Sequence, residues 1–409
     1  FLPDWLRQVL FTNPKAWDFS PHVGMADLHS RAGLPSPHAL GALERPSHVA
    51  LDRISLHDFR NHPATELEGT ARFNLLVGAN GAGKTNVLEA LSLLAPGRGL
   101  RRAKLPEVAR GAGAGGFSVG ARLSPQDGGE PIQLGTMIDP AQPTRRRVRI
   151  NRANASALAL AEWLSVRWLT PSMDGLFMDS AGARRRFVDR LVLTIAPQHA
   201  TLSNRYEAAL RDRNRLLSDE VAPDPRWLDA LEAQLAEHGA QIAANRRTLV
   251  DQLNAALLAA DDAHFPRPAL ALEPVGPEER VALAAALCDG RPQDRRAGRT
   301  LTGPHRTELA VTLADKRVPA AQASTGEQKA MLIAIMLAHG TLAAKDRAGI
   351  LLLDEVAAHL DPDRRVALFD RLAANGEQVW MTGTERAPFE AILPHAALWD
   401  VAGGTLQRG

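Results

Sequence analysis

Apolar residues follow two different periods along the chain, and the change between them predicts how it is organised. From residue 49 to residue 178, short apolar runs are separated by clusters of Gly, Pro, Asn and Asp, as in strands joined by turns. The runs "HVALDRISLHDF", "ARFNLLV" and "SVRWLTP" predict three strands. Short alternating runs between residues 111 and 150 predict an antiparallel sheet.

After Ser180 the pattern becomes helical. "SAGARRRFVDRLVLTIA" and "PQHATLSNRYEAALRDRNRLLSD" predict two helices, and a third of about 35 residues follows, roughly 50 Å long. Turn-rich sequence is expected from there to Arg299. The third helix has an extended apolar face, too short for a long coiled coil, made by Leu228, Leu231, Leu235, Ile242, Leu249, Leu253 and Leu257.

Beyond residue 300, strand and helix patterns alternate again, with "GILLLDEV" and "QVWMTGT" as predicted strands. We therefore predict an α/β fold in which one unit is made from both chain ends around an inserted helical arm. The predicted parts are an N-terminal extension (1–48), the first part of the α/β unit (49–178), the arm (179–299) and the second part of the α/β unit (300–409).

The first 48 residues mix Pro, His and Trp without a sustained period. They lack the basic and then apolar order of a signal peptide. We expect a poorly ordered extension ahead of the first domain, and a short partner-binding segment is the alternative.

Composition narrows the class of protein. A chain of 409 residues exceeds what one hydrophobic core usually supports, and its 45% apolar and 23% charged content is that of a globular protein. No apolar run is long enough to span a membrane. Cys288 is the only cysteine, which excludes an internal disulfide and fits a reducing cytoplasm. A net charge of +2 permits nucleic-acid binding without indicating it.

A full phosphate-loop motif, GxxxxGK[ST], is present at Gly78-Ala79-Asn80-Gly81-Ala82-Gly83-Lys84-Thr85. It follows a predicted strand and opens a predicted helix, so backbone N–H groups can turn toward phosphates at a helix N-terminus. Lys84 would reach the β- and γ-phosphates of ATP, and the Thr85 hydroxyl would ligate Mg²⁺. The alternative is a glycine-rich turn before an ordinary helix.

A second motif is an apolar strand that ends in two carboxylates, Ile350-Leu351-Leu352-Leu353-Asp354-Glu355. By itself it also fits a buried strand with a polar end. Beside a phosphate loop it is typical of a Walker B strand, in which Asp354 would hold Mg²⁺ directly or through water. Glu355 would then act as the general base on the attacking water, so hydrolysis is expected in addition to binding.

A third motif, "STGEQK", opens an apolar helix. Ser324 can cap that helix, with Glu327 completing a capping box. Gly326 lies in the first turn, where a helix former would be more stable by about 1 kcal/mol. A capped helix with a tolerated glycine accounts for Ser324 and Glu327 but leaves Gly326 unexplained.

The order of the motifs resembles that of the ABC-type ATPase head: phosphate loop, insertion, Ser-x-Gly-Glu-Gln, Walker B strand and then Leu-Asp at Asp361. In that class the signature helix of one head faces the γ-phosphate held by a second head. The resemblance implies an ATP-dependent homodimer in which Ser324 and Gly326 complete the partner's site. It also places Gln328 and Asp361 among the nucleotide-binding residues.

Within that class the chain resembles the RecF recombination-mediator family. The resemblance covers most of the chain from Leu51 to Asp361, in the blocks "SLHDFRNH", "GANGAGKTNVLEALSLLAPGRGLR", "SAGARRRFVDRLV", "YEAALRDRNRLL", "LTGPHRTEL", "STGEQK" and "LLLDEVAAHLD". It implies an ATP-dependent DNA-binding protein of recombinational repair and replication-fork maintenance. It further implies action on gapped DNA or single-strand/double-strand junctions, with RecO and RecR as partners in loading RecA.

The sequence departs from ABC heads at the position of the switch histidine, where "MTGTE" stands. Thr382 or Thr384 is the candidate γ-phosphate sensor there. Basic clusters are the candidate DNA contacts, because arginines can neutralise phosphates without reading sequence. The alternative is a solvated or ion-paired surface. The candidates are Arg98, Arg101, Arg102, Arg145, Arg147, Arg184 and Arg185.

Two other functions fit parts of the pattern. One is the nucleotide-binding subunit of a membrane ABC transporter, against which the missing switch histidine and the long helical insertion argue. The other is a DNA-binding scaffold with a vestigial ATPase, against which the intact Lys84, Thr85, Asp354 and Glu355 argue.

Overall fold

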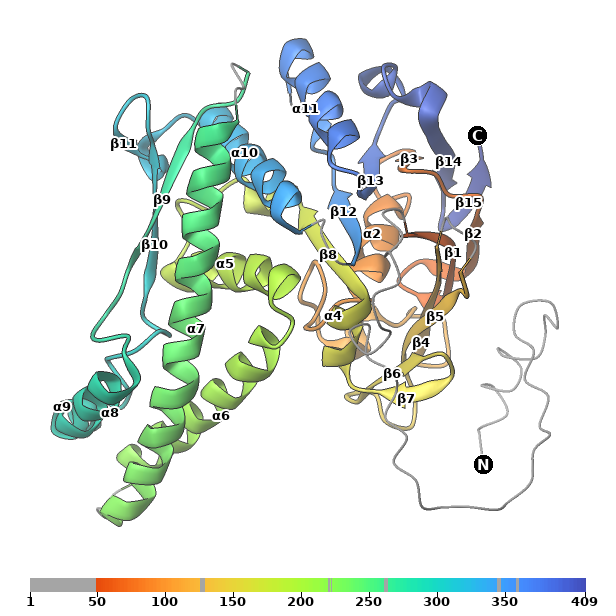
Figure 1. Ribbon diagram of the computed structural model, residues 1–409. Coiled ribbons are helices and arrows are strands. Elements are labelled where there is room, and N and C mark those ends of the chain that lie inside the picture. The colour runs from red at the N-terminus through yellow and green to blue at the C-terminus, as the bar shows by residue number, and fades with distance from the viewer. Residues whose placement is uncertain are drawn as a thin grey trace. The chain divides into compact units, whose positions relative to one another are not determined.

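The computed structural model describes residues 49–125, 129–219, 221, 223–260, 264–343, 347–357 and 360–409 (Figure 1). The predicted N-terminal extension, residues 1–48, lies outside the described residues. From residue 49 onward the described chain contains two six-stranded sheets, a three-stranded sheet and a group of helices.

One six-stranded sheet is assembled from both halves of the chain, as the apolar pattern predicts. Its strand order is β15-β14-β3-β13-β12-β8, and all neighbours are parallel except β14 and β15. The central strands β3, β12 and β13 are almost wholly apolar and buried, so they form the middle of the main core. The bounds are β3 Phe73–Val77, β8 Leu164–Leu169, β12 Ala348–Leu353, β13 Gln378–Gly383, β14 Ala396–Ala402 and β15 Thr405–Arg408.

The second six-stranded sheet is antiparallel, which confirms the prediction for residues 111–150. Its order is β2-β1-β4-β5-β6-β7. Helix α2 (Lys84–Ser92) packs against β13 of the first sheet and β1 of the second, and therefore lies between them (Figure 1). The bounds are β1 Val49–Phe59, β2 His62–Glu68, β4 Phe117–Pro125, β5 Ile132–Ile138, β6 Arg146–Ile150 and β7 Ala153–Ala155, with short helices α3 Leu105–Val108 and α4 Leu160–Trp163.

The three predicted helices of the middle segment are present as α5 (Ala181–Ile195), α6 (His199–Ser218) and α7 (Pro225–Ala259). Helix α7 has 35 residues and is the long green helix of Figure 1. Six of the seven predicted apolar positions on its face are buried, and Leu231 is half-buried. The helical period therefore identified the buried face correctly.

The prediction of turns from α7 to Arg299 is wrong. This stretch contains strand β9 (Pro268–Glu273) and helices α8 (Arg280–Asp289) and α9 (Arg291–Ala297). The sequence patterns of these elements are weak for two reasons. Strand β9 is held in place by its pairing with β10 (Glu308–Leu313), and α8 has only two buried side chains, Leu283 and Leu287, to mark its apolar face. Strand β11 (Val318–Pro319) completes this three-stranded sheet, and α10 (Thr325–Ala343) and α11 (Pro362–Ala374) follow.

A fully buried arginine joins the helices of the middle segment. The Arg213 guanidinium on α6 donates to Glu232 on α7 at 2.9 Å, and to Asp294 on α9 and the Thr300 hydroxyl at 2.7 Å each. A buried ion pair is stabilising only when its remaining donors are satisfied, as they are here by the carbonyl of Leu287. The network therefore fixes the relative positions of α6, α7 and α9.

Three buried or half-buried histidines predict that the folded protein becomes less stable as the pH falls. His62, His305 and His339 each donate Nε2–H to a backbone carbonyl. Burial lowers the pKa of all three, that of His305 to about 4. Because the unfolded chain binds these protons near pH 6.5 and the folded chain does not, the free energy of unfolding should fall by up to about 1.4 kcal/mol per pH unit per histidine between pH 6.5 and 5.

Urea denaturation at pH 7.5 and 5.5 measures this loss. Replacing His305 with Gln should reduce the pH dependence, whereas replacing the exposed His395 with Gln should leave it unchanged. A pH dependence equal in all three proteins would contradict the assignment.

Candidate nucleotide-binding site

The phosphate loop joins β3 to α2 at the carboxyl edge of the parallel sheet, where ligands bind in open α/β folds. Two of its glycines are required by geometry. A Cβ on Gly78 would lie 2.2 Å from the carbonyl oxygen of Val401. Gly83, the residue before α2, has φ 117°, which side chains other than glycine's rarely adopt. The loop is therefore a tight backbone cradle at the start of α2.

Lys84 is the first residue of α2, and its side chain bends back over the loop. Its Nζ donates to the carbonyl oxygens of Gly78 at 2.7 Å and Ala79 at 3.0 Å, and the residue is only 4% exposed. An ammonium held over a cradle of this kind is placed to meet a phosphate group.

The hairpin between β1 and β2 supports the far end of the loop. The side-chain amide of Asn61 donates to the carbonyl oxygen of Ala82 at 3.0 Å, and Nε2 of His62 donates to that of Gly83 at 3.1 Å. The backbone N–H of Gly404 donates to Ala82 as well. Motif reasoning missed Asn61 and His62, whose only sequence signal is the block "FRNH". Their hairpin precedes the motif and contacts it only in the fold.

The aspartate of the predicted Walker B strand lies beside the phosphate loop. Asp354 follows β12, and its Oδ1 accepts hydrogen bonds of 2.8 Å from the hydroxyls of Thr85 and Thr382. The sheet order explains the meeting, since β13, which carries Thr382, lies between β3 and β12. Thr85 and Asp354 are 269 residues apart in sequence and are brought into direct contact.

Glu355 occupies a position that is uncommon for its residue type. Its φ is 54°, in the left-handed region, and its backbone N–H donates to the Thr382 hydroxyl at 2.9 Å. Such backbone conformations are unfavourable and gather at functional sites. The half-buried carboxylate accepts no hydrogen bond from the residues that the structure describes. Of the two candidate sensor residues, Thr382 thus contacts both Walker B residues, while Thr384 is exposed.

The donor set at this edge fits Mg²⁺. Magnesium prefers oxygen ligands and is usually bound by one or two protein groups together with phosphate oxygens and water. The Thr85 hydroxyl and the Asp354 carboxylate are two such groups, 2.8 Å apart at the end of the phosphate loop. These are the two residues that the sequence predicts as metal ligands.

The signature motif forms the capping box that its sequence predicts. The Glu327 N–H donates to Oγ of Ser324 at 3.3 Å, and Glu327 Oε2 accepts from the Ser324 N–H at 2.9 Å and its hydroxyl at 2.8 Å. Lys316 contacts the same carboxylate at 2.5 Å, and together these donors, Lys316 first, lower the pKa of Glu327 to about 2. Both Ser324 and Glu327 are therefore engaged at the start of α10.

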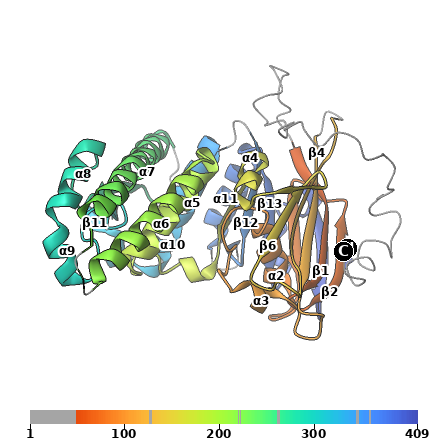
Figure 2. The same cartoon turned by 90° about the horizontal axis from the view of Figure 1, so that it is seen from below.

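Gly326 has open space around it. A Cβ built on this residue would meet no atom within 4 Å, so the packing of this chain does not require glycine there. In Figure 1 helix α10 lies on the opposite side of β8 from α2, and Figure 2 shows α10 on the side of α5 and α7, which it contacts, and α2 on the side of β1. The signature therefore does not face the phosphate loop of its own chain.

The other two predicted nucleotide-binding residues lie in local structure. Gln328 is buried, and its side-chain amide donates to the carbonyl oxygen of Ala323 at 2.9 Å. Asp361 is exposed and caps α11 by accepting from the N–H of Arg364 at 2.9 Å. The structure does not bring either of them into contact with Thr85 or Asp354.

Comparison with known proteins identifies the family. The family model described as "RecF/RecN/SMC N terminal domain" matches residues 50–392. The curated protein "DNA replication and repair protein RecF" of Rhizobium rhizogenes is 44% identical over 383 residues, which are 89% of this chain and all of that protein. The RecF proteins of Mesorhizobium japonicum and Brucella abortus are each 46% identical to this chain. Each alignment covers 88% of this chain, and the two alignments cover 98% and 97% of the respective relatives.

The chain belongs to the RecF family of DNA replication and repair proteins.

Solved structures confirm the ABC-type head fold of this RecF-family chain. A structure described as the recombination mediator protein RecF with ATPrS, in the RecFOR pathway, has a TM-score of 0.76 at 20% identity and covers 88% of this chain and 98% of its own. An Smc head domain derived from Pyrococcus furiosus has a TM-score of 0.51 at 15% identity, with 88% and 95% covered. Because the chain belongs to the RecF family, it is not the nucleotide-binding subunit of a membrane transporter. Among the described residues no helix has the length and apolarity to cross a membrane.

The arginines predicted as DNA contacts in this RecF-family chain fall into two groups. Four of the seven are already engaged within the chain, in the contacts Arg184–Glu308 at 2.6 Å, Arg185–Thr307 carbonyl at 2.9 Å, Arg101–Glu89 at 3.0 Å and Arg147–Asp139 at 3.5 Å. The other three are exposed and make no ion pair with the described residues: Arg98, Arg102 and Arg145. The sequence could not separate the groups, because their acidic partners come from other segments.

Proposed function

We propose that this RecF-family protein is a slow ATPase whose ATP-bound form is a two-fold dimer on DNA. The observation that carries the nucleotide site is the contact of Thr85 with Asp354 at the end of an intact phosphate loop.

In the proposed site the phosphate loop binds the triphosphate of ATP through its backbone N–H groups and Lys84. Thr85 and Asp354 would hold Mg²⁺, which would supply positive charge to neutralise the phosphates. Glu355 accepts a proton from the attacking water. Thr382 acts as a positioning residue, since its hydroxyl joins the side chain of Asp354 to the backbone of Glu355.

The proposed site is completed by a second copy of the chain. Support comes from Gly326, whose surroundings are open, and from the place of α10 on the opposite side of β8 from α2. Glycine there lets the backbone approach a phosphate closely, and the Ser324 hydroxyl would turn from Glu327, to which it now donates, and donate to the phosphate. A two-fold dimer then contains two equivalent sites.

The relatives are named as DNA replication and repair proteins and as a recombination mediator of the RecFOR pathway, which supports a role on DNA for this chain. We infer that the dimer binds double-stranded DNA and single-strand/double-strand junctions, works with RecO and RecR, and promotes loading of RecA. Hydrolysis through Glu355 would then open the dimer, so ATP limits the residence time on DNA. A DNA-binding scaffold with a vestigial ATPase is the competing function.

Sedimentation of the wild-type protein and of Ser324→Arg, with and without ATP, tests the composite site. ATP should convert the wild type from monomer to dimer, and the variant should stay monomeric because its side chain occupies the position of the approaching phosphate. ATP binding by the variant should persist, since Lys84 and Thr85 are unchanged. A variant that dimerises on ATP like the wild type would contradict the proposal.

Loss of the Ser324 cap by itself lowers helix stability by about 1 kcal/mol, so a control for capping is needed. Ser324→Ala removes the cap without adding bulk. It should dimerise more weakly than the wild type but more strongly than Ser324→Arg, and thermal melting of both variants should show an intact fold.

A further inference from the structure

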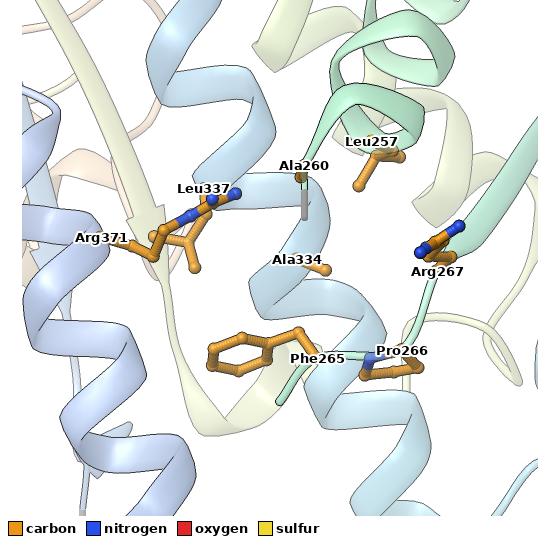
Figure 3. Close-up of a pocket in the computed structure, with 8 residues that line it drawn as sticks. All are labelled: Leu257, Ala260, Phe265, Pro266, Arg267, Ala334, Leu337 and Arg371. Atoms are coloured by element: carbon orange, nitrogen blue, oxygen red, sulfur yellow. The ribbon is translucent and has the colours of Figure 1, made fainter. Parts of the chain in front are cut away.

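A hollow of about 620 Å³ lies outside the nucleotide site, between the segment 96–102, strand β8 and helices α5 and α6. Four arginines line it: Arg98 and Arg102 from the segment that follows α2, and Arg186 and Arg190 from α5. By contrast, a small hollow between α7, α10 and α11, lined mainly by apolar groups such as Leu257, Phe265 and Leu337, measures about 20 Å³ and holds no more than a water molecule (Figure 3).

None of these four arginines makes an ion pair with any residue that the structure describes. This separates them from neighbours in the same two segments, since Arg101 pairs with Glu89 and Arg184 with Glu308. Arg190 instead lies over the ring of Trp168, with 4.5 Å from its Cζ to the ring centroid. The chain thus supplies close carboxylate partners to the adjacent arginines, and among the described residues it places no carboxylate within ion-pair distance of these four.

Arg102 lies close enough to Arg98, Arg186 and Arg190 for their positive charges to repel its own. Burial and then the positive charges of Arg186 and Arg98 lower the pKa of Arg102. Burial, followed by repulsion from Arg102, lowers the pKa of Arg190 to about 10. Like charges gathered in a partly desolvated hollow are unfavourable unless an anion binds there.

Three carboxylates also line the hollow, and two of them are engaged elsewhere. Asp189 accepts from Arg246 at 2.7 Å and from His199 at 3.0 Å, and Asp179 accepts from the N–H of Ser180 at 2.5 Å. Glu207 is 67% exposed and lies 3.9 Å from Arg211 on the outer turn of α6. Glu207 acts electrostatically on Arg102, and Asp179 on Arg186, so four arginines face two carboxylates and the hollow keeps a net positive charge.

We propose that this hollow binds the terminal phosphate monoester of a nucleic acid strand. The proposal rests on the DNA part of the proposed function and adds which feature of the DNA is recognised. A volume of about 620 Å³ admits one nucleotide but not a duplex, so a strand end fits it and a continuous helix does not. A monoester carries up to two negative charges at pH 7, whereas each phosphodiester of the backbone carries one, and four arginines favour the former.

Apolar groups beside the arginines suit the sugar and base of the terminal nucleotide. Leu158, Phe187 and Leu193 line the hollow together with the hydroxyl groups of Thr170, Ser172 and Ser203. A small set of polar groups among apolar ones is the usual composition of a site for one small organic group.

Fluorescence anisotropy with three DNA substrates tests the proposal. The substrates share one sequence with a single-strand/double-strand junction and end in a 5′-phosphate, in a 3′-phosphate or in hydroxyls only. The full chain is titrated with each in the presence of a saturating non-hydrolysable ATP analogue, so that the phosphate loop is filled. The wild type should bind at least one phosphate-bearing end roughly tenfold more tightly than the hydroxyl end, as charge-assisted hydrogen bonds are strong.

The double variant Arg102→Gln/Arg186→Gln should lose this preference and bind all three substrates alike. Its matched control is Arg205→Gln/Arg215→Gln, which removes two exposed charges from α6 outside the hollow, Arg215 having Asp212 as its ion-pair partner. The control should lower affinity for every substrate equally and keep the tenfold ratio. Because Arg102 and Arg186 are exposed and unpaired, both double variants should fold.

The phosphate monoester could belong to a strand end or to a free nucleotide. Competition between phosphate-bearing DNA and deoxyadenosine monophosphate tests whether the two bind at the same place. Displacement of the phosphate-bearing DNA by this nucleotide, in the wild type but not in Arg102→Gln/Arg186→Gln, supports the hollow as the site for the shared chemistry. Equal affinity for all three substrates, with no competition, overturns the proposal while leaving ATP-dependent DNA binding intact. If no substrate binds at all, the DNA part of the proposed function fails, and direct binding of the nucleotide alone then decides whether the hollow takes a phosphate monoester.

Discussion

Replacing Glu355 with Gln is expected to lower the rate of ATP hydrolysis by roughly 10² to 10⁴ while ATP binding is retained. The amide has nearly the shape of the carboxylate but cannot accept the proton of the attacking water. The contact that places this residue is made by its backbone N–H to Thr382, so the substitution leaves it unchanged. Lys84, Thr85 and Asp354 also keep their contacts.

The same substitution should also lengthen the lifetime of the ATP-bound dimer. With hydrolysis blocked, the ATP-bound dimer should persist, and dissociation from DNA should slow in proportion to the lost rate. Phosphate release and sedimentation with ATP measure the two effects. Glu390→Gln, an exposed acid outside the site, is the control and should match the wild type in both. Hydrolysis at the wild-type rate in Glu355→Gln would assign the general base elsewhere, and no hydrolysis in the wild type would favour the vestigial scaffold.

Mixing two inactive variants should restore activity. Lys84→Ala removes the cation of the phosphate loop, and Ser324→Arg blocks the signature, so neither protein alone forms a working site. In a mixed dimer one site carries both defects and the other carries none. Random pairing makes half of the dimers mixed, each with one working site, so about a quarter of the wild-type rate is expected.

Steady-state hydrolysis at a fixed total protein concentration measures this recovery. A mixture of Lys84→Ala with Glu355→Gln is the control, because both substitutions lie on the phosphate-loop side and every site in every dimer remains defective. Recovery in the control mixture, or none in the test mixture despite mixed dimers seen by sedimentation, would contradict a site shared between two chains.

Much of the fold could be predicted from local signals. The strand–loop–helix run from β3 to α2 and the apolar strand β12 combine a strong motif with the expected period, and both are present as predicted. The 35-residue helix α7 was predicted because its apolar face is long enough for the helical period to be measured. These elements carry their own signal and do not need a partner to be recognised.

What could not be predicted depends on partners distant in sequence. Strand β9 is defined by its pairing with β10, and the support of Gly83 by His62 comes from a hairpin that precedes the motif. The same reason separates Arg184, which has Glu308 as a partner, from Arg186, which has none among the described residues. Charge clusters in sequence show where arginines are, and only the fold shows which of them are already neutralised.

The position of β3 in its sheet has a consequence for the order in which the protein is made. Both neighbours of this buried apolar strand, β13 (Gln378–Gly383) and β14 (Ala396–Ala402), leave the ribosome long after it does. At about 5–20 residues per second, the 269 residues between Thr85 and Asp354 take on the order of 10 to 50 s to synthesise. During that interval the phosphate loop has no Walker B partner, so the ATP site forms only after Asp354 has been synthesised.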